Sequence, residues 1–127
     1  MFPDRRIDST ESALTLFAPI SGEGCEIAAF AYLDPKRRLL GLRHIRSPHD
    51  DAIEVEVRAI AADAIAFGAT AMVMAHNHPS GDCSISRADI AFTKRLSQGM
   101  EALGVRLCDH LVLARNDYSS FVERGYL

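Results

Sequence analysis

Apolar residues follow two different spacings along this chain, one typical of strands and one of helices. Residues 25–33 are apolar at every position after Glu26, which predicts a strand covered on both faces. Residues 39–45 follow a D-P-K-R-R turn and are expected to form the return strand of a hairpin, with a loop at 47–51. Residues 69–75 form another short apolar run, which predicts a second buried strand.

Two further segments have the spacing of amphipathic helices. In the first, an apolar stripe begins at Val57, and the helix is expected to stop near Gly68. In the second, Ser86 and Asp89 resemble a capping box that opens the helix, and Gly104 is expected to end it. Both apolar stripes are interpreted as core, so the helices are expected to pack on a sheet.

The rest of the pattern completes one domain. Residues 105–113 alternate between apolar and polar and predict a last strand, and 118–121 are expected to pack back on the core as an edge segment. Residues 1–12 are polar and are expected to be a loose lead-in to a single domain over 13–127. The order β-β-α-β-α-β predicts an α/β fold, a single-domain sandwich of three-layer type with one mixed β-sheet flanked by helices.

Composition and charge narrow the class of protein. Of 127 residues, 48% are hydrophobic and 24% charged, as in a folded globular domain. Fourteen Lys and Arg against seventeen Asp and Glu give a net charge of −3, so strong nucleic-acid binding is not expected. No apolar run has the length of a membrane span, and three cysteines without a C-x-x-C pair offer no disulfide framework. The expected location is the cytoplasm, and the oligomeric state stays open.

A set of metal-ligand residue types follows the second buried strand. His76 and His78 are two positions apart at its end, so their side chains leave the same face. Asp89 adds a carboxylate from the first turn of the next helix. Two histidines and one carboxylate are a recurring ligand set of catalytic zinc, whose fourth position is left to water. The sequence therefore predicts Zn²⁺ as cofactor, bound by these three residues.

Metal-assisted hydrolysis also needs a group that takes and returns protons. Glu26 is the lone acid of an otherwise apolar strand, and such an acid is a candidate for a shifted pKa. Ser86 and Asp89 also have a structural interpretation, because a helix N-cap favours these residue types. His110 stands beside Asp109 in a predicted strand and is interpreted as half of a hydrogen-bonded structural pair.

These residues carry a family resemblance. The string A-H-N-H-P-S-G-D-C-S-I-S-R-A-D resembles the JAMM (JAB/MPN-plus) metalloprotease signature. The strings H-N-H-P-S-G, L-C-D-H-L-V-L and Y-S-S-F-V-E-R-G are similar to the RadC-like branch, over about residues 22–127. The resemblance implies a JAB/MPN, cytidine-deaminase-like fold, with zinc on His76, His78 and Asp89. It also implies Glu26 as proton carrier and Ser86 as a stabiliser of the tetrahedral oxyanion.

The activity implied by this resemblance is zinc-dependent cleavage of a peptide or isopeptide bond in a protein or peptide substrate. A non-catalytic metal-binding interaction module and a DNA-repair-associated RadC-like protein remain as alternatives. A metal-dependent nuclease is disfavoured by the acidic pI near 5.9. A zinc deaminase is disfavoured because its H-x-E and P-C-x-x-C patterns are missing. Cys83 stands where RadC-like chains usually have proline and is interpreted as an ordinary loop thiol.

Overall fold

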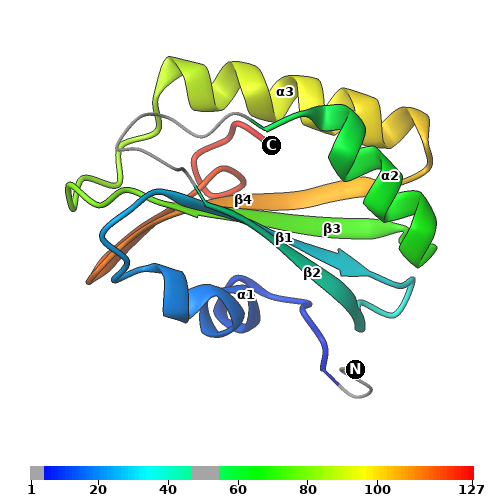
Figure 1. Ribbon diagram of the computed structural model, residues 1–127, viewed down its shortest axis with the longest axis horizontal. Coiled ribbons are helices and arrows are strands. Elements are labelled where there is room, and N and C mark those ends of the chain that lie inside the picture. Colours follow the sequence, from blue (N-terminus) through cyan, green and yellow to red (C-terminus); the bar gives the residue numbers. More distant parts are fainter. Residues whose placement is uncertain (1–4, 47–54) are drawn as a thin grey trace.

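The computed structural model describes residues 5–46 and 55–127, and five strands in them form one sheet (Figure 1). The strands are β1 (Ile27–Leu33), β2 (Leu39–Arg46), β3 (Ala71–Asn77), β4 (Arg106–Ala114) and β5 (Asp117–Ser120). Their spatial order is β2-β1-β3-β4-β5. The pair β3 and β4 is parallel, while the other neighbours are antiparallel, so the sheet is mixed, as predicted.

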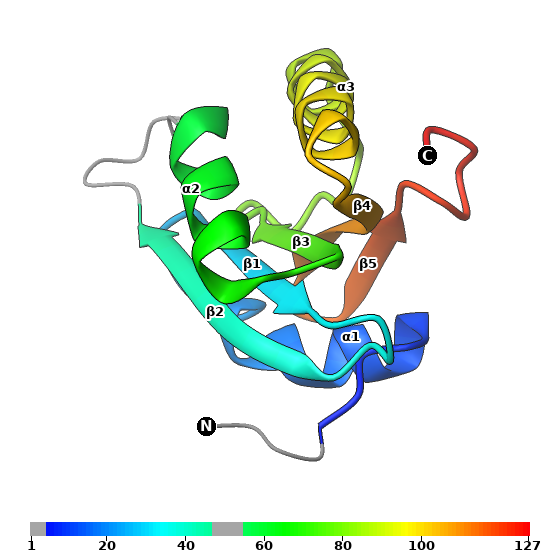
Figure 2. The same ribbon diagram turned by 90° about the vertical axis from the view of Figure 1, so that its right-hand side faces the viewer.

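Helices cover both faces of this sheet (Figure 2). Helix α1 (Thr10–Phe17), continued by the 3₁₀ turn η1 (Ala18–Ile20), lies on one face, and helices α2 (Val57–Phe67) and α3 (Arg87–Ala102) lie on the other. Alternate residues of β1 enter two separate apolar clusters, one around α1 and one around α2 and α3. The predicted α/β sandwich of three layers is confirmed. Among the described residues, we find no helix with the length and apolar character needed to cross a membrane.

The elements expected after residue 24 are all found, with ends shifted by one or two residues. Gly68 ends α2 in the left-handed conformation at φ 67°, and Ser86 caps α3 in a reciprocal capping box, both as predicted. The expected edge segment is β5, which pairs with β4 at the margin of the sheet. The loop expected at 47–51 lies outside the described residues.

The loose lead-in expected over residues 1–12 is wrong from Arg6 onward. Arg6 forms a β-bridge with Arg38, and Ile7 is buried at 3% exposure in the cluster around α1. The polar residues that suggested a linker are instead a helix cap, because Ser9 and Ser12 form the capping box of α1. The domain therefore uses residues before Ala13 to cover its sheet.

Candidate metal centre

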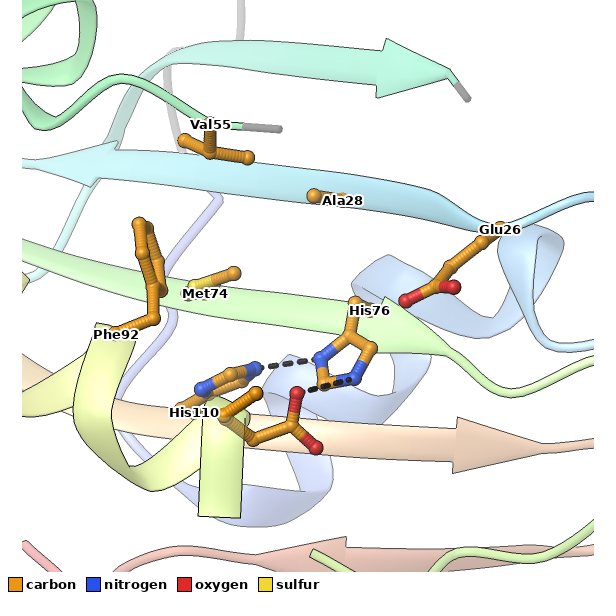
Figure 3. Close-up of a pocket in the computed structure, with 9 residues that line it drawn as sticks. Glu26, Ala28, Val55, Met74, His76, Phe92 and His110 are labelled. Carbon is orange, nitrogen blue, oxygen red and sulfur yellow. Dashed lines mark hydrogen bonds and ion pairs between the residues drawn. The ribbon is translucent and has the colours of Figure 1, made fainter. Parts of the chain in front are cut away.

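Three segments that are far apart in sequence meet at one end of the sheet (Figure 3). Strands β1 and β3 run antiparallel with Ala28 opposite His76, so the start of β1 lies beside the end of β3. Glu26 stands immediately before β1 rather than inside it, which corrects the expected strand start by two residues. The N-terminal turn of α3 brings Asp89 to the same place.

The histidine pair presents matching nitrogen atoms to Asp89. His76 Nε2 lies 2.9 Å from His78 Nε2. The Asp89 oxygens lie 3.5 Å from His76 Nε2 and 3.7 Å from His78 Nε2. Ligand atoms of a tetrahedral zinc site are about 3.3–3.6 Å apart when each bond is about 2.0–2.2 Å long. The distances from Asp89 to the two rings are close to this spacing, while the two nitrogen atoms lie closer together, and the donor set suits a divalent metal ion.

The other ring nitrogen of each histidine is held by a partner on the far side from this point. His78 Nδ1 lies 2.7 Å from the carbonyl oxygen of Asp82, to which only an N–H can donate. His76 Nδ1 lies 2.6 Å from His110 Nε2. The Asp82 carbonyl fixes the His78 tautomer that leaves Nε2 free to bind a metal, whereas in the His76–His110 pair either ring can be the donor. Burial lowers the pKa of His76 to about 4, so its ring is neutral near neutral pH.

Glu26 provides a second carboxylate at the same pair of rings. One carboxylate oxygen of Glu26 and a ring nitrogen of each of His76 and His78 all lie within 4.8 Å of one another. Burial raises the pKa of Glu26, Asp89 raises it slightly, and His78 works in the opposite direction. Glu26 and Asp89 therefore both lie near the imidazoles, and the pKa of Glu26 is raised towards neutrality.

Ser86 holds the Asp89 carboxylate through the cap of α3. The Ser86 N–H donates to Asp89 Oδ2 over 3.1 Å, and Ser86 Oγ accepts from the Asp89 N–H over 3.0 Å. These capping bonds orient the carboxylate that faces the two histidines. The role of the Ser86 hydroxyl at an oxyanion stays a prediction.

His110 belongs to the site, and its expected hydrogen bond with Asp109 is present but involves the His110 backbone, not its ring. Its ring is 1% exposed and connects His76 to Thr93, whose Oγ1 lies 2.6 Å from His110 Nδ1. Asp109 Oδ1 instead accepts from the backbone N–H of His110, because adjacent strand residues point to opposite faces. The ring of His110 also stacks on Phe121 with centroids 4.4 Å apart. His110 thus supports the His76 ring from behind.

Asn77, between the two histidines, fastens the segment that carries Glu26. It is 0% exposed, and its Oδ1 accepts from the Ile27 N–H over 2.6 Å. Its Nδ2 donates to the carbonyl oxygens of Cys25 at 2.9 Å and Glu23 at 3.2 Å. These three bonds fix the backbone on both sides of Glu26. The sequence signal was the position of Asn77 in H-N-H, but its partners lie about fifty residues away and could not be read from the motif.

Cys83 keeps its interpretation as a structural loop thiol. It is buried, burial raises the pKa of its thiol, and its carbonyl accepts from Ser119 Oγ over 2.6 Å. A thiol with a raised pKa is a poorer metal ligand, because the thiolate is the form that binds.

Comparison with known families identifies the family of this chain. The family model described as RadC-like JAB domain matches residues 7–126. The match starts at the first buried residue of the structure, Ile7, and includes all five residues predicted for the site. Because it spans almost the whole chain, this protein belongs to the RadC-like JAB domain family.

Proposed function

We propose that this protein is a zinc-dependent hydrolase of the JAMM type, which cleaves a peptide or isopeptide bond in a protein or peptide substrate. One observation carries the proposal: His76 and His78 both have Nδ1 engaged and turn Nε2 towards Asp89. A residue pair that served only to stabilise the strand end would not need both Nε2 atoms to face the same carboxylate. The family membership supports the same function.

His76, His78 and Asp89 would hold the zinc ion, and an open position would remain for water and substrate. Zinc bound there would supply a Lewis acid and lower the pKa of water from about 15.7 towards about 7. The Asp89 carboxylate is pre-oriented for this task by the Ser86 N–H. The imidazole of His76 is pre-oriented by His110.

Glu26 would move the proton. Its pKa is raised by burial, so the carboxylate can accept a proton from water more readily than an exposed glutamate can. The protonated Oε can then donate to the nitrogen of the departing amine. Asn77 holds the backbone on both sides of this residue, which keeps the carboxylate within reach of the histidine pair.

Asp89 is the better third ligand of the two carboxylates. Its oxygens reach both rings within 3.7 Å, and Ser86 already fixes their direction. The pKa of Glu26 is raised, and a raised pKa suits a proton carrier more than a metal ligand, which must stay ionised. The assignment of ligand and base is therefore testable by exchanging one carboxylate at a time.

The test is hydrolysis of a peptide mixture by the zinc-loaded protein, followed by mass spectrometry. Glu26→Gln is expected to lower turnover by about 100-fold or more, because general acid–base catalysis contributes about 10²–10⁴-fold. Glu23→Gln is the matched control. Glu23 lies three residues before Glu26 in the same segment, and its side chain forms an ion pair with Arg46. Unchanged turnover in Glu26→Gln would remove Glu26 from the mechanism. Absence of hydrolysis by the zinc-loaded wild type would favour a metal-binding interaction module.

A further inference from the structure

The candidate metal centre continues into a pocket with an apolar far end (Figure 3). The pocket has a volume of about 180 Å³. Glu26, His76 and Asp89 line the end that faces the metal centre. The remaining lining residues are Ala28, Val55, Met74, Ala88, Phe92 and His110, and of these Val55, Met74, Phe92 and His110 lie away from Glu26 in Figure 3. The chemistry of the pocket thus changes from charged to apolar along its length.

The floor of this far end is part of the sheet. Ala28 pairs with His76 across the two strands, and Met74 pairs with Phe30, so both side chains stand on the face covered by α2 and α3. Both are almost fully buried. Phe92 and Ala88 form a wall from the first two turns of α3. A floor built on central strands holds the shape of the pocket before any ligand arrives.

The lining decides which chemical group fits. The pocket's titratable residues are Glu26, His76, Asp89 and His110, and His110 has both ring nitrogens engaged. A charged group placed at the apolar end would lose its water without gaining a partner, which is costly. An apolar cavity of about 150 Å³ is large enough for benzene in another protein. The whole pocket, including the end at the metal centre, has about this volume, so its apolar side has room for an aliphatic or aromatic group no larger than a phenyl ring.

A second hollow, which shares Glu26 with the first, lacks this character. It is lined by Gly24, Cys25, Glu26, His78, Pro79 and Ser80. In the described part of the chain, this lining includes no Leu, Ile, Val, Met or Phe. A peptide that crosses the metal centre would thus meet large apolar side chains in one hollow and none of them in the other.

We propose that the apolar end binds an aliphatic or aromatic side chain of the substrate, next to the bond that is cleaved. The substrate class is then a peptide or protein segment with an apolar residue at that position. This inference rests on the proposed hydrolase, because only a bond held at the metal centre places the neighbouring side chain in the pocket. The residues that determine the preference are Met74, Ala88 and Phe92.

The experiment measures binding rather than turnover. Straight-chain hydroxamates, which chelate zinc, are titrated into the zinc-loaded full chain by calorimetry, from acetohydroxamate to hexanohydroxamate. Each added methylene is expected to tighten binding about fourfold until the pocket is full. Ala88→Phe is expected to abolish this dependence, because Ala88 is exposed on α3 and a larger side chain there fills the pocket without disturbing the core. Ala102→Phe, at the exposed far end of the same helix, is the matched control.

Affinities that do not depend on chain length in the wild type would overturn the proposal, and so would an unchanged dependence in Ala88→Phe. Cleavage sites in a peptide mixture, mapped on the same preparations, separate this proposal from the proposed function. Cleavage without an apolar preference would remove the pocket and leave the hydrolase. Chain-length-dependent binding without any cleavage would leave the pocket as a ligand site and remove the hydrolase.

Discussion

His110 provides the sharpest test of how the fold prepares the metal centre. A His76 ring that binds metal through Nε2 carries its proton on Nδ1, and that N–H must donate to His110 Nε2, 2.6 Å away. His110→Leu removes the acceptor but keeps an apolar side chain against Phe121. Without metal, His76 can move its proton to Nε2. With metal on Nε2 the proton must stay on Nδ1, so the unpaired N–H destabilises only the metal-bound state.

The expected magnitude follows from this asymmetry. A buried donor without a partner costs about 1–3 kcal/mol. At about 1.36 kcal/mol per factor of ten, this corresponds to about 5- to 150-fold weaker zinc binding. Loss of outer-shell partners in metal sites typically costs about 10–100-fold in affinity, which is the same range.

Zinc affinity is measured by competition with a chromophoric chelator. His110→Gln is expected to recover much of the loss, because an amide oxygen can accept from His76 Nδ1. Phe121→Leu is the matched control: it perturbs the same stack and leaves the hydrogen bond intact. The reasoning is refuted if folded His110→Leu binds zinc as tightly as the Phe121→Leu control does.

Three further predictions concern the supports of the site. Asn77→Ala removes three hydrogen bonds beside Glu26, so turnover should fall about tenfold or more. The zinc content, measured by metal analysis, should stay the same, and full turnover in this variant contradicts the prediction. Ser86→Ala should lower the free energy of unfolding in urea by about 1 kcal/mol through loss of the α3 cap, and an unchanged midpoint contradicts it. Burial lowers the pKa of His76 from 6.5 to about 4, so between these values the unfolded chain binds more protons. The free energy of unfolding of the metal-free protein should therefore be highest above about pH 6.5 and fall towards pH 4. The fall should be smaller in His76→Gln, and an equal fall in both proteins contradicts the lowered pKa of His76.

The hydrophobic pattern predicted most of the fold because most elements bury a full face. The seven residues of β1 are all buried, as are all seven residues of β3 and seven of the nine residues of β4. Helix α1 was not predicted because it buries only Ala13 and Phe17 over two turns, and its cap is made of serines, which also occur in linkers. A short helix with a small buried face has too few apolar residues to show a recognisable helical periodicity in the sequence.

The candidate site was predictable where its residues are local in sequence. The H-x-H spacing and the helix start placed His76, His78 and Asp89, because strand and helix geometry fix their directions. His110 was missed because it reaches His76 through the parallel pairing of β3 and β4, in which Met74 lies opposite His110. A sequence shows that strands form, but it does not show their register. Asn77 was missed for the same reason, since its partners come from the segment before β1.

The central claim is that His76, His78 and Asp89 hold zinc and that Glu26 does not. Metal analysis of gently purified protein tests it directly, because Glu26 lies close enough to the histidines to compete with Asp89 for the role of third ligand. We expect about one zinc per chain in the wild type and in Glu26→Gln, and loss of zinc in His78→Ala and Asp89→Ala. Zinc retained in Asp89→Ala and lost in Glu26→Gln would contradict the account.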